Sequence, residues 1–521
     1  MVVKTKIILE DKELIVHSEQ PRSILEIITQ TGIDMDAPCA GLGRCGRCQV
    51  YICGELPPDE VEKAILSETE INAGIRLACR NRTIPDNLVI RVTKEHKEET
   101  QTIQKIMPVD IGVVIDLGTT TIAIAFINLS NATMITMHSI LNPQRVYGAD
   151  VISRIKSALD QEVLKNMMRI TINAITAEIK RMLSDIGLDT EYIKKIYIAG
   201  NTTMEHIISG MDVSSLAKAP YRPLFTGFRS LPELNAALGL NNVEARLFPV
   251  VGGFVGGDTI ASILACNMDM SDENIALFDI GTNAEIAIGN RSFILTSSAP
   301  AGPAFEGGQI RYGMRAQAGA IEGISIIDDE LKLYVKSNKE PEGICGSGLI
   351  KIVAELLRAG VITTSGELIE PEKISGNLSL RVVKKENEYA FVLYRSFNRE
   401  IYLYQSDIRA LQLAKASISA GFELTSRQAK TRAKKLYIAG AFGNYLDTND
   451  LVLIGMIPLY LKDTTYFIGD AVISGLKRFL INEPRVDMDK LLSITKHFEL
   501  ANDPSFNNVF LSMLELTPKI Q

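Results

Sequence analysis

The sequence predicts an α/β protein in which a small cysteine-bearing domain precedes a larger part built from two similar lobes. Two observations lead to this prediction. Three cysteines, Cys39, Cys45 and Cys48, fall within ten residues of a chain that has seven cysteines in all. Beyond residue 110, three different motifs each occur twice and in the same order along the chain. Such a repeated order indicates a duplicated architecture.

The composition describes a globular chain and excludes some classes of function. A formal net charge of −7 argues against a nucleic-acid-binding protein, which would show a basic face. No apolar run reaches the roughly 18 residues of a membrane helix, so no membrane partner is expected. The first residues, MVVKTKIILEDKELIV, alternate apolar with polar residues, which is not typical of a targeting segment. We therefore expect a cytoplasmic protein, whose clustered cysteines serve as metal ligands or redox groups rather than disulfides.

The spacing of the clustered cysteines predicts an iron-sulfur centre. The pattern Cys-x5-Cys-x2-Cys, followed by a fourth cysteine about thirty residues on, is close to the plant-type [2Fe-2S] spacing. Glycines in the loop let backbone N–H groups turn toward the cluster sulfurs. Structural zinc is the alternative, but a zinc ribbon normally supplies two Cys-x-x-Cys pairs and this chain has one. The expected ligands are Cys39, Cys45, Cys48 and Cys79.

The segments around the cysteines predict a small sheet with a helix. Residues 3–17 are typical of a β-hairpin, residues 22–32 of a short helix ended by Gly32, and residues 47–54 of a strand. This order resembles the β-grasp ferredoxin domain. Cys53 lies on the last of these strands, and we expect it to be a small buried apolar residue rather than a ligand.

Changes in composition suggest where the domains begin and end. We expect the ferredoxin-like domain at 1–94 and a charged linker without clear periodicity at 95–110. The first lobe then spans 111–274, and its segment 149–190 has the pattern of amphipathic helix whose apolar stripe packs into the core. The second lobe spans 275–521.

The repeated motifs are three strand-and-turn segments. The first is a strand, then Asp-x-Gly-Thr, then a second strand; the second is a strand ending in Ile-Ala-Gly; the third is a Gly-Asp turn before a helix. The pairs are VVIDLGTTTIAIAFI (113–127) with ALFDIGTNAEIAIGN (276–290), KKIYIAGN (194–201) with KKLYIAGAFGN (434–444), and FVGGDTIASIL (254–264) with FIGDAVISGL (467–476).

The chemistry of these motifs points to a nucleotide. In each Asp-x-Gly-Thr hairpin the glycine admits phosphate oxygens to the backbone and the threonine adds a hydroxyl donor, so two facing hairpins would clamp a polyphosphate. Asp116 and Asp279 would hold Mg²⁺ directly or through water. Glu285 and Asp258 could orient the attacking water or the metal-bound waters, although Asp258 is nearly as well suited to cap a helix. The residues expected to bind the nucleotide are Gly118, Thr119, Thr120, Gly200, Asn201, Gly281, Thr282, Asn283, Gly440, Ala441, Gly443, Asn444, Gly469 and Asp470.

From about residue 111 to 521 the chain resembles the acetate and sugar kinase, Hsp70 and actin superfamily. A more specific resemblance rests on SSAPAGPAFEGGQIRYGMRAQAGAIEG (297–323), GICGSGLI (343–350) and SDIRALQLAKASISAG (406–421). These segments are similar to those of the ATP-dependent reductive activators of corrinoid proteins. By themselves the glycines suggest loops at a phosphate or partner site, or tight turns, and we expect Cys345 and Cys266 to be buried rather than iron ligands.

The resemblance implies a function. The chain would use ATP and Mg²⁺ to pass an electron from its [2Fe-2S] cluster to an inactive Co(II) corrinoid protein of a methyltransferase system and so restore Co(I). It would take electrons from an external low-potential reductant and form a homodimer. A small-molecule kinase with a ferredoxin appendage and a non-enzymatic redox sensor gated by nucleotide are the alternatives. The related dehydratase activators bridge a [4Fe-4S] cluster across a dimer, and no matching cysteine pair occurs in these lobes.

Overall fold

The structure of this chain is a computed structural model. It describes residues 2–9, 12–19, 23–31, 48–54, 56–66, 71–80, 84–86, 88–92, 108–440 and 446–519. It divides into two compact units, Met1–Gly256 and Gly257–Gln521. No helix in these described segments is both long and apolar enough to cross a membrane.

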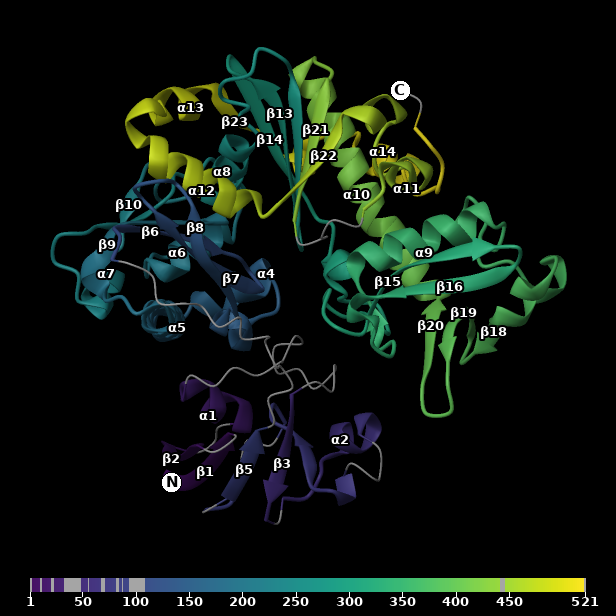
Figure 1. Cartoon of the computed structure of the whole chain (residues 1–521), viewed down its shortest axis with the longest axis horizontal. Helices are drawn as coiled ribbons and strands as arrows, with labels where there is room; N and C mark the ends of the chain where they lie inside the picture. The colour runs from purple at the N-terminus through teal and green to yellow at the C-terminus, as the bar shows by residue number, and fades with distance from the viewer. Residues whose placement is uncertain are drawn as a thin grey trace. The chain divides into compact units, whose positions relative to one another are not determined.

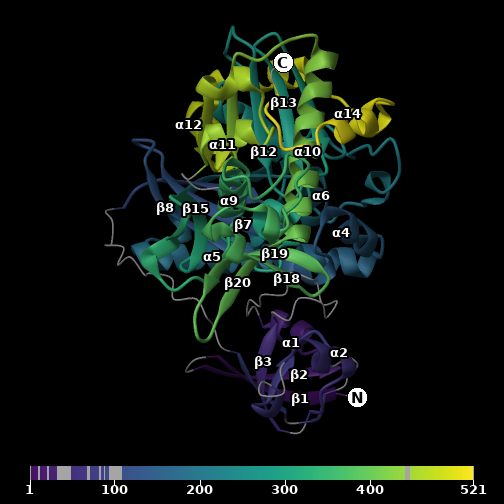
Figure 2. The ribbon, with the colours of Figure 1, turned by 90° about the vertical axis from the view of Figure 1, so that its right-hand side faces the viewer.

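Five strands form the amino-terminal sheet, in the order β2-β1-β5-β3-β4. Figures 1 and 2 show this sheet together with helices α1 and α2. The elements are β1 (Val2–Leu9), β2 (Lys12–Glu19), α1 (Ile24–Gln30), β3 (Gln49–Cys53), α2 (Glu60–Ile65), β4 (Ile75–Leu77) and β5 (Leu88–Val92). The hairpin of β1 and β2 is antiparallel, and β1 pairs in parallel with β5. Ile7, Ile24 and Ile90 are fully buried in its core. The predicted hairpin, helix and strand are confirmed, whereas Gly32 lies outside the described residues.

The first lobe is built on a six-stranded sheet in the order β10-β11-β9-β6-β7-β8. Its strands are β6 (Ile111–Leu117), β7 (Thr121–Asn128), β8 (Met134–Leu141), β9 (Ile193–Gly200), β10 (Arg229–Ser230) and β11 (Ala245–Leu247), and its helices are α4 (Val151–Ala158), α5 (Gln161–Ile186), α6 (Thr202–Ile208) and α7 (Pro232–Leu238). The predicted helical segment is thus two helices, because the Asp160 side chain caps a new helix at Gln161. The apolar stripe of α5 lies in the core with β6 and β7, as predicted.

The second unit contains a six-stranded sheet in the order β22-β21-β12-β13-β14-β23. Its strands are β12 (Ile275–Ile280), β13 (Ala284–Asn290), β14 (Phe293–Ala299), β21 (Lys435–Ala439), β22 (Thr465–Gly469) and β23 (Thr495–His497). Helix α10 (Gln405–Ala429) covers one face, where Phe278 meets Phe422 edge to face at a centroid distance of 5.2 Å. Helices α8 (Gly257–Ala265) and α12 (Ala471–Asn482) cover the other face (Figure 1).

Helices α8 and α12 pack against each other with their backbones close together. A Cβ atom placed on Gly475 would lie 1.7 Å from the carbonyl oxygen of Ala261, so only glycine fits there. The remaining elements of this unit include two three-stranded sheets. They are β15 (Ala320–Ile327), β16 (Glu330–Val335), β17 (Gly343–Ile344), α9 (Gly346–Arg358), β18 (Val382–Lys385), β19 (Glu388–Arg395), β20 (Glu400–Tyr404), α11 (Thr448–Leu453), α13 (Met488–Ile494) and α14 (Phe506–Ser512).

Five strands of each six-stranded sheet share one topology, whereas the sixth strand, β10 or β23, lies at opposite edges. In each, an antiparallel three-stranded meander is followed by two further strands that pair in parallel with its first strand and with each other. The predicted fold class, with a ferredoxin-like domain and a duplicated two-lobe fold, is confirmed. The lobe boundary at 274 and 275 stays a prediction; the compact units divide between Gly256 and Gly257, so α8 packs within the second unit.

Candidate functional site

The first Asp-x-Gly-Thr hairpin joins β6 to β7. Asp116 is the last residue but one of β6. A Cβ atom on Gly118 would lie 2.6 Å from the carbonyl oxygen of Thr121, so the turn requires glycine. The fully buried side chain of Asn142 holds the turn from outside, because its Nδ2 donates to the Gly118 carbonyl at 2.8 Å and its backbone N–H donates to the Thr120 carbonyl at 2.9 Å. Asn142 lies in no repeated motif, so its place in the sequence did not mark it as a site residue.

The three motifs of the first lobe meet at this turn. Asn201 caps α6 by accepting a hydrogen bond from the Met204 N–H, and its Nδ2 donates to Thr119 Oγ1 at 3.0 Å. A Cβ atom on Gly256, in the third motif, would lie 2.3 Å from the carbonyl oxygen of Gly200. The folded lobe therefore brings these predicted site residues together, although they are far apart in the chain.

In the second unit, the corresponding hairpin carries Asp279 at the carboxyl end of β12. Ser262 of α8 donates a hydrogen bond of 2.7 Å to Asp279 Oδ2. Burial raises the pKa of Asp279 to about 6; the Ser262 hydrogen bond opposes this shift and the Asp470 carboxylate adds to it. Ser262 lies within the third motif, 254–264, but was not singled out, because its residue type alone does not show that it contacts Asp279.

Glu285 lies directly across the ladder from Asp279. Burial, followed by the nearby carboxylates of Asp258 and Asp279, raises the pKa of Glu285 well above its ordinary value, while a hydrogen bond from Ser298 opposes the shift. Asp258 lies in the first turn of α8 rather than at a cap position, and accepts from the Thr259 N–H. The fold therefore collects these carboxylates on the face of the sheet that α8 covers.

The third motif of this unit supplies another carboxylate. Asp470 is the N-cap of α12 and accepts from the Ile473 N–H at 2.9 Å. Burial raises the pKa of Asp470, and this backbone hydrogen bond opposes the shift. The Gly440 N–H donates to the Gly469 carbonyl, so the second and third motifs are also adjacent here. Ala441, Gly443 and Asn444 lie outside the described residues.

The turn after Asp279 has a neighbour that the sequence analysis did not single out. Thr282 Oγ1 donates to Glu306 Oε2 at 3.2 Å, and the Gly281 N–H donates to the Asn283 carbonyl at 2.9 Å. Glu306 belongs to the segment 297–323. The resemblance of this segment to a family was the one sequence feature that could have indicated Glu306 as a site residue. Within the described segments, no three His, Cys, Asp or Glu side chains converge closely enough to hold a metal ion.

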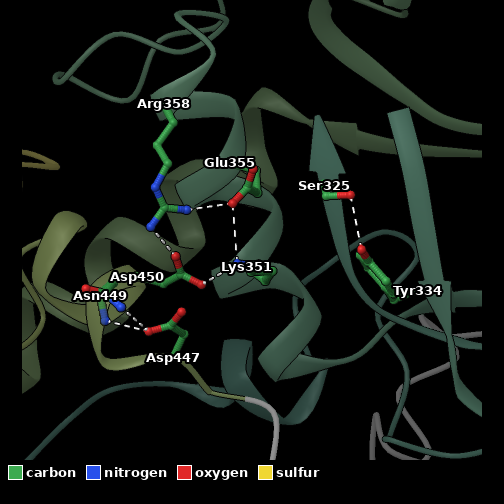
Figure 3. A network of polar contacts seen from close by, with 8 residues as sticks. All are labelled: Ser325, Tyr334, Lys351, Glu355, Arg358, Asp447, Asn449 and Asp450. Carbon is green, nitrogen blue, oxygen red and sulfur yellow. Dashed lines mark hydrogen bonds and ion pairs between the residues drawn. The ribbon is translucent and has the colours of Figure 1, made fainter. Parts of the chain in front are cut away.

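A buried ion-pair network fixes the segment after the second motif of this unit (Figure 3). Asp450 on α11 is almost fully buried and pairs with Lys351 and Arg358 of α9. Glu355 of α9 contacts the same two cations, at 3.3 Å and 2.6 Å. Helix α9 begins in the glycine-rich segment at Gly346, so the network ties two of the predicted site segments to one framework.

Two of the four predicted cluster ligands are described. Cys48 precedes β3 and Cys79 follows β4, and both side chains are buried. The Ala78 N–H donates to the Cys48 carbonyl at 2.8 Å, so the two cysteines lie on adjacent segments. Cys39 and Cys45 lie outside the described residues.

For one of the remaining cysteines, the predicted burial is wrong. Cys53 is exposed, not buried, because alternate residues of β3 face outward and Cys53 is one of them. Cys266 and Cys345 are buried, as predicted. Burial raises the pKa of the Cys266 thiol to about 12, which suits a core residue rather than a reactive thiol.

Fold and site together define a chain that joins a ferredoxin-type domain to a duplicated nucleotide-binding fold. Residues 7–82 match the 2Fe-2S iron-sulfur cluster binding domain, residues 111–271 the RACo middle region, and residues 273–520 the C-terminal domain of RACo, the ASKHA domain. The chain belongs to the RACo family of corrinoid activators.

Individual relatives agree with this assignment. The corrinoid activation enzyme RamQ of Eubacterium limosum is 31% identical over 77% of this chain and 69% of its own length. The [Co(II) methylated amine-specific corrinoid protein] reductase of Methanosarcina barkeri is 25% identical over 77% of this chain and 76% of its own length. A solved structure of a reductive activator for corrinoid, iron-sulfur protein aligns with a TM-score of 0.70 over 99% of this chain and 98% of that chain, at 24% identity, which supports the fold.

Proposed function

We propose that this protein is an ATP-dependent reductive activator that passes one electron from a [2Fe-2S] cluster to an inactive Co(II) corrinoid protein. The electron leaves the reduced cluster and converts Co(II) to Co(I), and an external low-potential reductant reduces the cluster again. The main support for this proposal is that one chain of the RACo family contains both an iron-sulfur domain and a duplicated ASKHA fold. Its partner is a corrinoid protein of a methyltransferase system, and we propose that the chain acts as a homodimer.

The need for ATP follows from the redox chemistry. Reduction of Co(II) by a plant-type cluster is uphill, and a gap of about 100 mV for one electron corresponds to roughly 2.4 kcal/mol. ATP binding or hydrolysis supplies more than this. The nucleotide-binding lobes would therefore provide the driving force and the cluster the electron.

The cluster would be held by Cys39, Cys45, Cys48 and Cys79 and would supply one-electron transfer. The positions of Cys48 and Cys79 support this ligand set, because their segments are hydrogen bonded to each other and their side chains are both buried. Cys53 is exposed on the outward face of β3, which supports its exclusion from the set of cluster ligands.

The motif residues of both lobes would bind ATP, with Asp116 and Asp279 holding Mg²⁺ directly or through water. The raised pKa values of Asp279, Glu285 and Asp470 support a cation, because none of the charged groups that shift them is positive. A divalent ion would favour the ionised carboxylates. Asp258 and Glu285 would orient the attacking water, and Ser262 would keep Asp279 in one orientation. We also propose the domain limits 1–94, 111–274 and 275–521.

The decisive test mixes the dithionite-reduced protein with a Co(II) corrinoid protein and follows the absorption of Co(I). We expect Co(I) to form with Mg-ATP and not without it. Asp279→Ala should abolish the formation of Co(I) with Mg-ATP. Asp272→Ala, which changes an exposed carboxylate paired with Arg291, should not abolish it. Equal Co(I) formation without nucleotide would refute the proposal. Phosphorylation of a metabolite at a rate independent of the cluster would favour the kinase alternative.

A further inference from the structure

A cavity of about 350 Å³ lies within the second unit, at the carboxyl end of α10. One of its lining residues, Thr431, accepts a hydrogen bond from the Asn274 side chain directly before β12. Asp279 lies at the opposite, carboxyl end of β12, and Gly440 directly follows the carboxyl end of the parallel strand β21. The cavity and the predicted nucleotide site therefore lie at opposite ends of the sheet and are separate sites.

The cavity wall carries an excess of positive charge. Its four cations are Arg427, Lys430, Arg432 and Lys519, and its one carboxylate is Glu423. Glu423 pairs with Arg427 at 2.6 Å. Over the part of the chain that the structure describes, the other three cations form no ion pair with a carboxylate. Three positive charges thus remain without an acidic partner at the cavity.

A buried lysine adds to this charge. Lys415 is fully buried and donates from Nζ to the backbone carbonyl of Glu515. Its Nζ lies 3.5 Å from where a Cβ atom on Gly455 would be, and Gly455 lines the cavity. Burial, followed by repulsion from Lys519, lowers the pKa of Lys415 to about 7. An anion near Lys519 would relieve this repulsion.

The rest of the cavity wall is mainly apolar. It also contains one polar group that makes no hydrogen bond within the described segments. The guanidinium carbon of Arg432 lies over the ring of Tyr460, 3.6 Å from its centroid, and both residues line the cavity. Phe422 and Met513 complete an apolar side. The hydroxyl of Ser426 is buried at the same wall and has no hydrogen-bond partner within the described segments.

We propose that this cavity binds a small organic anion that joins a carboxylate or phosphate to a planar apolar body. Lys430, Arg432 and Lys519 would contact the anionic group, Ser426 would donate a hydrogen bond, and Tyr460 and Phe422 would contact the apolar body. The volume lies at the lower end of the range of about 300–1,000 Å³ found for small-molecule sites. The site is separate from the nucleotide chemistry and stands whether or not the proposed function is correct.

Equilibrium dialysis of the full chain with anilinonaphthalenesulfonate tests the proposal, because this probe has one negative charge on a planar apolar body. The titration is run with saturating Mg-ATP present. We expect saturable binding to a single site per chain. Arg432→Gln combined with Lys519→Gln should weaken binding about tenfold or more, and Lys430→Glu, at an exposed helix end, should weaken it as well.

The matched control is Lys434→Gln combined with Lys435→Gln, which removes two cations paired with Glu273 outside the cavity lining. This control should bind the probe within about twofold of the unaltered chain, and neutral phenylnaphthylamine should bind far more weakly than the sulfonate. An unchanged far-ultraviolet circular dichroism spectrum in each variant shows that it is folded. Absence of saturable binding with Mg-ATP present, equal weakening in both double variants, or equal binding of the neutral analogue would each overturn the proposal.

Discussion

The Ser262 hydroxyl on α8 donates a 2.7 Å hydrogen bond to Asp279 Oδ2 on β12. Ser262 is fully buried beside this carboxylate. The bond favours the ionised carboxylate and opposes the burial that raises the pKa of Asp279 to about 6. A helix of the third motif thereby lowers the pKa of a carboxylate of the first motif.

Ser262→Ala should shift the acid limb of the pH profile of ATP hydrolysis to higher pH. Loss of the donor raises the pKa of Asp279 further, by about 0.5–1 unit for a hydrogen bond of about 1 kcal/mol. The measurement is kcat/KM for ATP between about pH 5 and pH 8. Ser417→Ala is the control, since Ser417 is also a buried serine of this unit but its hydroxyl has no partner within the described segments. An unchanged acid limb in Ser262→Ala would show that Asp279 does not set it.

Asp279→Asn should lose ATP hydrolysis and gain stability. The pKa of Asp279 in the folded protein, about 6, lies above its ordinary value of 3.8, so folding favours the protonated form. The folded state is therefore destabilised as pH rises from about 4 through about 6, and an uncharged asparagine avoids this loss. Because Asp279 is partly exposed, we expect a gain of about 2 kcal/mol at pH ~7 and less at pH ~5. Melting temperatures without nucleotide or metal test this, and a less stable variant at pH ~7 would contradict it.

Asp116→Ala should remove Mg²⁺-dependent ATP hydrolysis while leaving the visible absorption of the iron-sulfur centre intact. The reason is that the carboxylate belongs to the nucleotide-binding lobe, whereas the expected cluster ligands belong to the amino-terminal domain. ATP hydrolysis and the absorption spectrum are measured on the same sample. Loss of the visible absorption in this variant would show that the proposed domain division is wrong.

The purified protein should contain two irons and two acid-labile sulfides per chain, as a [2Fe-2S] centre requires. Replacing Cys39, Cys45, Cys48 or Cys79 by alanine should remove the centre. Cys53→Ala is the control and should keep it, because Cys53 lies on the outward face of β3. Stoichiometric zinc without sulfide would refute the iron-sulfur assignment.

Asp450→Ala should destabilise the second unit by about 2 kcal/mol. The change leaves Lys351 and Arg358 without their buried acidic partner, and a charge-assisted hydrogen bond contributes roughly 1.5–3 kcal/mol (Figure 3). Glu355 stays beside both cations and limits the loss. The melting temperature reports the effect. Asp489→Ala, at an exposed carboxylate in the first turn of α13, should leave it almost unchanged.

A cut in the linker near residue 100 should separate the two activities. The amino-terminal fragment should still pass electrons to small dyes and the remaining fragment should still hydrolyse ATP. Neither alone should reduce a Co(II) corrinoid protein, because one lacks the energy input and the other lacks the electron. If nucleotide alters partner affinity in the intact chain but no electron reaches cobalt, the sensor alternative is correct.

Much of the fold follows from local and repeated patterns. The hairpin of β1 and β2 was predictable because alternating apolar residues define a half-buried strand. The duplicated lobes were predictable because three motif pairs keep their order, and five strands of the two sheets have the same topology. Cys53 was mispredicted because a strand alternates its faces, and a position in the sequence does not say which face is covered.

By itself the sequence determined the class of architecture, the family and the candidate cysteines and carboxylates, because these depend on residue type and spacing. Only the tertiary structure decided which side chains hold them in place. Asn142 reaches Gly118 and Ser262 reaches Asp279 through the packing of separate elements, across 24 and 17 positions of the chain. The raised pKa of Glu285 likewise depends on the side chains that share its buried face. Such contacts depend on how elements pack, which no local residue pattern specifies.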